Sequence, residues 1–145
     1  MPAKRPPKPR DQELFRGDHV RGVAIPEPAA DASIVRHILY LDGAGRPTPY
    51  TSTTHDRAIA RTFSRPRGRI WETSVQQAQI HGAAHLPLDE LLQNLRGKGH
   101  GARFAGRPSE VAQARVYAER HCEHLLDWRA VHPTEIADHV RALFR

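Results

Sequence analysis

The spacing of apolar residues along the chain predicts a series of short helices and strands. Apolar positions recur at helical spacing in stretches that we predict to be helices: 31–41, 57–64, 88–95, 108–120 and 133–144. Short runs bounded by turn signals predict strands at 13–16, 50–53, 69–73 and 122–126. Residues 75–86 fit either strands or a broken helix. The chain therefore mixes both kinds of element.

Local signals add detail to this pattern. Thr54 or Asp56 is expected to cap the helix at 57–64, and Ile59, Ala60 and Phe63 are expected to face inward. Four glycines and little apolar content predict a mobile loop at 97–106.

The length and composition predict one domain. At 145 residues the chain can bury a core of its own, which we place at residues 13–145. Residues 1–12 carry four prolines among charged side chains, so we expect a flexible basic arm or linker there. A single cysteine, Cys122, excludes an internal disulfide framework. No apolar run approaches the roughly 20 residues of a membrane helix or forms a secretory signal, so we expect a soluble chain without a membrane partner.

The net charge of +6 suggests a polyanionic partner, but its distribution is uneven. Four basic residues precede the first acidic one, and the rest of the chain is only mildly basic. Two arginine-rich stretches remain, at 57–69 and 96–107. They could line a surface that faces nucleic acid, or they could be solvated faces of short elements.

Three separated polar residues suggest the handling of a dinucleotide. Arg16 ends a short apolar run, and its guanidinium matches phosphate oxygens two at a time. Glu123 is a candidate to stabilise an oxocarbenium-like ribose, and Ser52 is a candidate to hold that carboxylate in one rotamer. Each also has a structural interpretation, because single arginines, strand hydroxyls and solvated glutamates are common.

The order and context of these residues resemble the ADP-ribosyltransferases of the arginine-serine-glutamate class. Leu14-Phe15-Arg16-Gly17 is similar to the first strand of that family, and Tyr50-Thr51-Ser52-Thr53-Thr54 with Asp56, Ala60 and Phe63 is similar to its middle motif. Glu119–Leu126, followed by Val131–Ile136, resembles its terminal glutamate strand. The resemblance implies an α+β fold, a split β-sandwich of two small sheets with flanking short helices and an NAD cleft between the sheets.

The resemblance also implies roles for individual residues. Arg16, Ser52 and Glu123 would be catalytic, and the backbone of Gly17 would hold the nicotinamide amide. Tyr50 or Phe63 would stack on nicotinamide. The resemblance further implies that Thr51 and Ser52 help to bind NAD and that His121 helps to select the acceptor.

One departure from the family leaves the functional hydroxyl open. The middle motif reads Thr-Ser-Thr where the family has Ser-Thr-Ser, so Thr51 and Thr53 remain alternatives to Ser52. A second departure is His121, because the family commonly has Gln or Glu at that position. The choice of acceptor cannot be carried over.

The function implied by the resemblance is transfer of ADP-ribose from NAD to a macromolecule, with release of nicotinamide. RNA or DNA is one expected acceptor and protein is the alternative. The resemblance to toxin modules of the polymorphic Rhs type suggests a secreted effector that acts in the cytoplasm of a target cell and meets an immunity protein. An NAD glycohydrolase and a non-catalytic nucleic-acid-binding domain are the other hypotheses.

The histidines near Glu123 do not favour a metal site. Neighbouring residues of a strand point to opposite faces, so His121 and Cys122 would not reach one ion. The chain also lacks the ligand spacing of the common zinc motifs.

Overall fold

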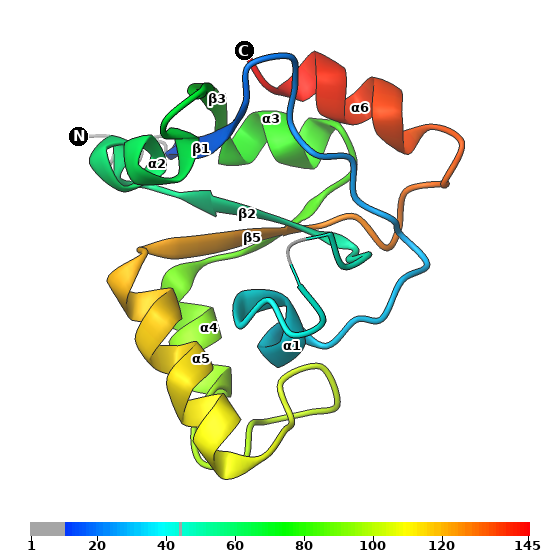
Figure 1. Cartoon of the computed structure of the whole chain (residues 1–145). Coiled ribbons are helices and arrows are strands. Elements are labelled where there is room, and N and C mark those ends of the chain that lie inside the picture. The colour runs from blue at the N-terminus through cyan, green and yellow to red at the C-terminus, as the bar shows by residue number, and fades with distance from the viewer. Residues whose placement is uncertain (1–10, 44) are drawn as a thin grey trace, which may run out of the picture.

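The protein is an α+β domain built on one antiparallel sheet. The computed structural model describes residues 11–43 and 45–145. Five strands form the sheet in the order β3-β1-β2-β5-β4 (Figure 1). The strands are β1 (Glu13–His19), β2 (Tyr50–Thr54), β3 (Gly68–Ser74), β4 (Ala84–Leu86) and β5 (Glu123–Asp127). The helices are α1 (Ile34–Ile38), α2 (Arg57–Ser64), α3 (Val75–Ile80), α4 (Leu88–Asn94), α5 (Pro108–Arg120) and α6 (Ile136–Leu143).

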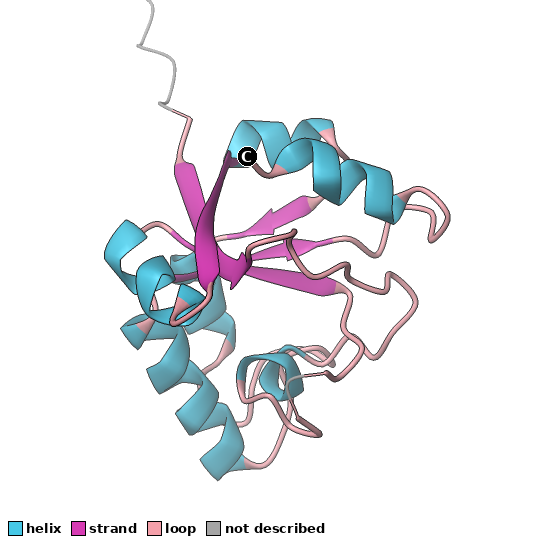
Figure 2. Cartoon of the chain, turned by 45° about the horizontal axis from the view of Figure 1, so that its top comes forward, coloured by secondary structure: helices cyan, strands magenta, loops and turns pink. Residues whose placement is uncertain are grey.

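The pairing between β1 and β2 is the shortest in the sheet. These strands pair only at Phe15 and Thr54, whereas β1 pairs with β3 over seven positions and β2 with β5 over five. Figure 2 shows the strands seen from a second direction. The sequence led us to expect two packed sheets, and the structure corrects this: one residue pair joins the two halves into a single sheet. The backbone groups beyond that pair need other partners, because β1 and β2 then diverge.

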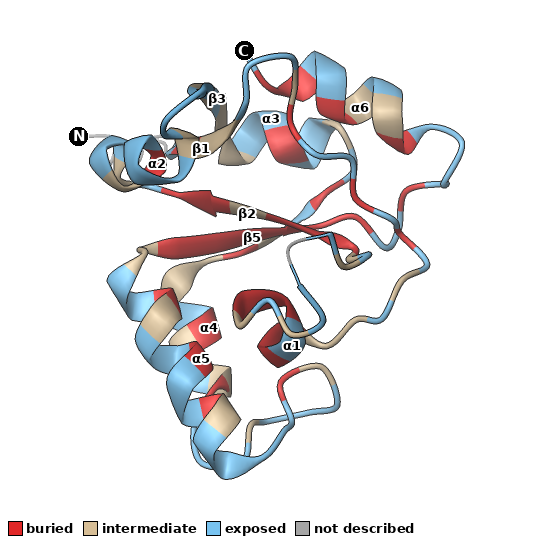
Figure 3. Cartoon of the chain, viewed as in Figure 1, coloured by how far each residue is buried: buried red, intermediate tan, exposed pale blue. Residues whose placement is uncertain are grey.

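The two faces of the sheet support two separate cores. Helices α1, α4 and α5 pack on one face around Tyr50 and Leu125, and α3 and α6 pack on the other around Leu126 and Trp128 (Figures 1 and 3). Alternate residues of β5 therefore serve alternate cores, as the period of a strand requires. All five residues of β5 are buried, and the strand lies between β2 and β4 in the sheet.

Several predicted elements are confirmed. The strand at 50–53 and the helices at 57–64, 88–95 and 108–120 match β2, α2, α4 and α5 to within one residue. The ambiguous stretch at 75–86 contains a helix and then a strand, α3 and β4. In the described part of the chain, no helix combines the length and the apolar character that crossing a membrane requires.

Other predicted boundaries were wrong. Strand β1 continues to His19 and pairs along its whole length with β3. Helix α1 has only five residues. Its first turn is capped by Ser33, two positions after the predicted start at 31. Strand β5 begins at Glu123, since Cys122 has a positive φ of 47° that an extended strand does not allow.

One prediction about exposure was also wrong. Phe63 does not face inward, because the residue is 46% exposed at the end of α2. The loop at 97–106, for which we predicted mobility, contains Phe104, which is buried in the core with α1 and α5. A backbone hydrogen bond from Ile34 to the Arg103 carbonyl, 2.7 Å long, ties this loop to α1 as well.

The expected arm at residues 1–12 is described only in part, since residues 1–10 lie outside the described residues. Asp11 accepts a hydrogen bond from the Gln76 backbone, and the Gln12 carbonyl accepts one from Val75. Asp11 and Gln12, which the sequence assigned to the arm, are therefore hydrogen-bonded to the folded domain.

Gly17 lets α2 lie directly against β1. A Cβ atom at this position would lie 2.1 Å from the Ala60 carbonyl oxygen and 2.6 Å from the Ser64 backbone nitrogen. Both contacts are with backbone, so no side chain could rotate to make room. The glycine thus has a packing role in addition to the ligand role that the resemblance implies.

We predict that Gly17→Ala destabilises the domain by about 1–3 kcal/mol or more, because α2 must move away from β1. Gly22→Ala is the matched control, since a Cβ atom there meets nothing within 4 Å. Urea unfolding of both variants checks this. Equal stability of the two variants would mean that α2 does not press on position 17.

Candidate functional site

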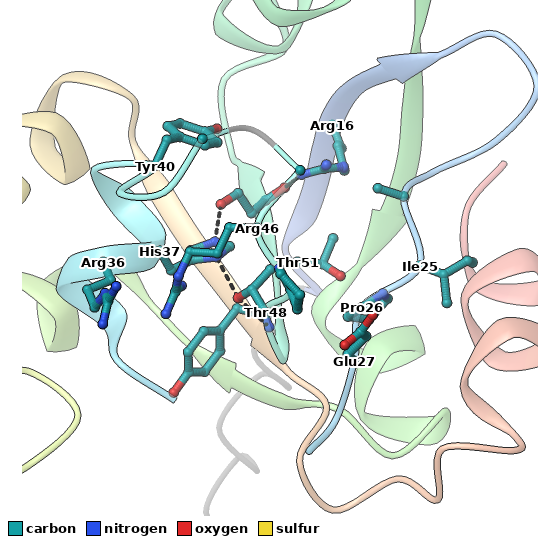
Figure 4. A pocket seen from close by; sticks show the side chains of 16 residues that line it. Arg16, Ile25, Pro26, Glu27, Arg36, His37, Tyr40, Arg46, Thr48 and Thr51 are labelled. Atoms are coloured by element: carbon teal, nitrogen blue, oxygen red, sulfur yellow. Dashed lines mark hydrogen bonds between the residues drawn. The ribbon is translucent and has the colours of Figure 1, made fainter. Parts of the chain in front are cut away.

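Two adjoining cavities lie where β1 and β2 diverge. One, of about 290 Å³, is lined by residues that include Gly17, Phe63, His121 and Glu123. The other, of about 220 Å³, is lined by residues that include Arg36, Arg46 and His37, and Figure 4 shows its side chains. These residues line both cavities: Arg16, Ala24, Tyr40 and Ser52. The pair is large enough to hold an extended ligand that passes Arg16 and Ser52.

Glu123 is a buried carboxylate at the start of β5. Burial raises its pKa to about 7, although hydrogen bonding from the Ser52 side chain and the charge of Arg16 both lower it. The residue is only 8% exposed, yet it lines the larger cavity. A carboxyl that titrates near neutral pH inside a cavity is typical of functional sites.

Arg16 bridges the gap between the two diverging strands. Its Nη1 donates to the Ser52 carbonyl over 2.9 Å, which replaces a backbone hydrogen bond that β1 no longer supplies. Its Nε donates to Asp18 Oδ2 over 2.7 Å. Burial raises the pKa of Asp18, but Arg16 and the backbone N–H groups of Ala24 and His19 together lower it by more, so the net shift is downward. The guanidinium is thus held in place beside both cavities.

Strand alternation separates Ser52 from the two threonines beside it. Thr51 Oγ1 accepts a hydrogen bond of 2.9 Å from Trp128 Nε1, and Thr53 Oγ1 donates to the His124 carbonyl over 2.8 Å. Both threonines are 3% exposed. Ser52 lies on the opposite face, the one that Glu123 shares through the pairing of Thr54 with Glu123. Of the three candidate hydroxyls, Ser52 is therefore the one that the strand directs to the side of the carboxylate.

His37 belongs to this site and was missed in the sequence. Its Nε2 lies 2.7 Å from Ser52 Oγ and its Nδ1 lies 2.7 Å from Thr48 Oγ1, as the dashed lines in Figure 4 mark. Burial, together with the charges of Arg16 and Arg46, lowers the pKa of His37 to about 3. The spacing from Ile34 places His37 on the inward face of α1, which is the signal that could have identified it.

The aromatic residues at the site are arranged differently from the prediction. Tyr50 is 2% exposed and its hydroxyl donates to the Ala32 carbonyl over 2.7 Å, so its ring belongs mainly to the core. Phe63 contacts His121 edge to face, with ring centroids 5.0 Å apart, and both line the larger cavity. Tyr40, which the sequence did not single out, is 52% exposed and lines both cavities. The accessible rings are those of Phe63 and Tyr40.

His121 is the C-terminal cap of α5 rather than a strand residue. Burial and the charge of Arg120 lower its pKa. Its place beside Phe63 puts it at the cavity that contains Glu123. From this position, His121 can contact a molecule that approaches the Glu123 carboxylate from solvent.

His124, the residue after Glu123, points to the other face of β5. It lies between His55 and His85, at N···N distances of 2.8 and 2.9 Å, so other imidazoles engage both of its ring nitrogens. Burial and these two histidines lower its pKa to about 4, although Asp89 opposes the shift. Among residues 11–43 and 45–145, no group of three or more side chains is arranged to hold a metal ion.

Part of the arginine-rich surface is engaged in local contacts. Arg57 pairs with Glu72, Arg69 stacks over Trp71 at 3.8 Å, and Arg103 binds Asp127 over 3.0 Å. Helix α2 nevertheless carries Arg57 and Arg61 at exposed positions. Arg16, Arg36 and Arg46 line the smaller cavity, so positive charge is present there as well.

Comparisons with known proteins add no relative. No family model, no curated protein and no solved structure matches the chain.

We predict that the stability of Glu123→Gln relative to the wild type is greater at pH 8 than at pH 5. The pKa of Glu123 rises from an ordinary value of 4.5 to about 7 on folding, so the native state binds its proton more tightly than the unfolded state. The free energy of unfolding of the wild type therefore decreases as pH rises from 4.5 to 7, whereas the amide of the variant makes no such contribution. The difference between variant and wild type should grow by up to about 3 kcal/mol over this range.

Urea unfolding at both pH values measures this difference. Glu90→Gln, at an exposed position of α4, serves as the control and should show the same offset at pH 5 and pH 8. A Glu123→Gln offset that is equally independent of pH would contradict the raised pKa.

Proposed function

We propose that this protein cleaves NAD at its nicotinamide bond and transfers the ADP-ribose to a macromolecular acceptor. The observation that carries the proposal is the meeting of Glu123, Ser52 and Arg16 at one cavity. They come from three strands that are far apart in sequence, in the order and roles that the resemblance to ADP-ribosyltransferases implies. The same resemblance implies the family's fold, and we propose that the single sheet, whose halves are joined only at Phe15 and Thr54, is a form of it.

Glu123 would act on the ribose next to nicotinamide. The glycosidic C–N bond breaks with its electron pair leaving on the nicotinamide nitrogen, and positive charge develops on the ribose. An ionised carboxylate beside that ribose stabilises the charge and can accept hydrogen bonds from its hydroxyls. An acceptor nucleophile then forms a new bond to the same carbon and loses its proton.

Arg16 and Gly17 would bind the two ends of the reacting half. Arg16 borders both cavities, so its guanidinium can contact phosphate in one while nicotinamide enters the other. The backbone of Gly17 would bind the nicotinamide amide, and the exposed ring of Phe63 would stack on it. Thr51, facing the other core, would contribute through the strand rather than through its hydroxyl.

The identity of the acceptor distinguishes three versions of this hypothesis. His121 would contact the acceptor, because it lies at the cavity edge beside Phe63. RNA or DNA is the acceptor that the neighbouring arginines favour, and protein is the alternative. Water as the acceptor would make the protein an NAD glycohydrolase. A non-catalytic nucleic-acid-binding domain would need none of the three site residues.

The biological role we propose is that of a secreted bacterial effector of the Rhs type. It would act in the cytoplasm of a target cell and be neutralised by an immunity protein. The support is the resemblance to such toxin modules and the small size of the chain.

We predict that the wild type releases nicotinamide from NAD and that Glu123→Gln reduces this release at least 100-fold, because the amide cannot stabilise the developing charge. Purified protein is incubated with labelled NAD in a bacterial lysate, and nicotinamide and bound label are both measured. Treatment with nuclease or protease then identifies the acceptor.

Glu90→Gln is the control and should act like the wild type. Label lost to nuclease supports a nucleic-acid acceptor, label lost to protease a protein acceptor, and free ADP-ribose alone a glycohydrolase. If the wild type releases no nicotinamide in the lysate, the enzyme proposal is wrong.

We predict that the rate of nicotinamide release at low NAD concentration rises as pH increases through about 7, because only the ionised Glu123 carboxylate is active. A pH–rate profile from 5.5 to 8.5 tests this. A rate that already reaches its plateau below pH 5.5 would contradict it.

A further inference from the structure

A line of partly buried hydrogen bonds leads from Thr48 through His37 to Ser52. The two ring nitrogens of His37 each lie 2.7 Å from a hydroxyl oxygen, Thr48 Oγ1 on one side and Ser52 Oγ on the other. Thr48 Oγ1 also accepts a hydrogen bond of 3.2 Å from the Tyr50 backbone N–H. None of these contacts depends on a bound ligand.

The protons of this line can be assigned in one order that uses each of them. Since Thr48 Oγ1 already accepts from Tyr50, its own proton is best used toward His37 Nδ1. The neutral ring then carries its proton on Nε2 and donates it to Ser52 Oγ. Ser52 consequently keeps its own hydroxyl proton for another acceptor. In the reverse order, Ser52 would spend that proton on His37 and the Thr48 proton would have no recipient among these groups.

The acceptor next to Ser52 is the Glu123 carboxylate. Both residues lie on the same face of paired strands, as diagonal neighbours, and both line the larger cavity. The Ser52 side chain is one of the two groups that lower the pKa of Glu123 against burial, and Arg16 is the other.

We propose that His37 is a positioning residue for the carboxylate. Held by Thr48 in the tautomer with its proton on Nε2, it donates to Ser52 and thereby directs the Ser52 hydroxyl toward Glu123. The role of His37 in orienting Ser52 is a property of the folded chain, and only its effect on rate rests on the proposed function.

The surroundings keep His37 neutral, as this role requires. It is 9% exposed, and the charged side chains that act on it are Arg16 and Arg46. Burial and both arginines lower its pKa to about 3, so it does not gain a second proton at ordinary pH. A charged imidazole would donate from both nitrogens and would turn the Thr48 hydroxyl away.

The first test reads the tautomer directly. A two-bond proton–nitrogen correlation spectrum of the labelled protein distinguishes a ring protonated on Nε2 from one protonated on Nδ1. We expect the His37 signals to show the proton on Nε2 at pH 6–8, with His37→Gln used to assign them. A proton on Nδ1 would overturn the proposal, because Ser52 would then have to donate to His37.

The second test compares two replacements of His37. Gln can place an amide donor near the position of Nε2, whereas Met fills similar space without a donor. We expect His37→Met to raise the pKa of Glu123, followed by carbon NMR of its carboxyl, by about one pH unit. Nicotinamide release by the same variant should fall roughly tenfold. His37→Gln should restore most of both properties.

His139→Met is the matched control, since it removes a histidine from α6 that contacts His81 instead of the site. It should leave the pKa of Glu123 and the rate unchanged. Equal effects of the Met and Gln variants at position 37 would mean that His37 only fills space, and the proposal would be wrong. If the wild type releases no nicotinamide, the proposed function fails, while the tautomer and the pKa of Glu123 still decide the role of His37.

Discussion

The pairing of β2 with β5 is the constraint on which the candidate site depends. It sets Thr54 opposite Glu123 and Ser52 opposite Leu125, so the serine and the carboxylate share one face. A slip of one residue would turn a threonine to that face instead. The hydrogen bond from Trp128 to Thr51 opposes such a slip from the other side of the sheet, because it uses the hydroxyl that would otherwise move.

Charge at the site is compensated unevenly. Arg16 lies close enough to Glu123 to influence it, but its Nε is paired with Asp18. Burial therefore outweighs the attraction, and the carboxyl titrates near neutral pH instead of near its ordinary value. The same arginine also closes the gap between diverging strands, so one side chain supports both the sheet and the electrostatics.

Helices and strands that have a clear local sequence pattern could be predicted. Contacts between residues that are far apart in the sequence could not. The period of apolar residues located α4 and α5, and the hydroxyl-rich run located β2. The bend at Cys122, the exposure of Phe63 and the burial of Phe104 depend on what packs nearby, and no local pattern carries that information. The site shows the same division. Arg16, Ser52 and Glu123 line one cavity, whereas His37 looked like an ordinary polar residue between two isoleucines.

A carboxyl that titrates near pH 7 inside a cavity makes binding there sensitive to the charge of the ligand. A cationic group that enters beside Glu123 favours the ionised form, so its binding is accompanied by release of a proton to solvent. In the proposed reaction the positively charged nicotinamide ring of NAD becomes a neutral leaving group. The attraction that helps to hold the substrate is then lost for that product, and the carboxyl regains its proton more readily as the product departs.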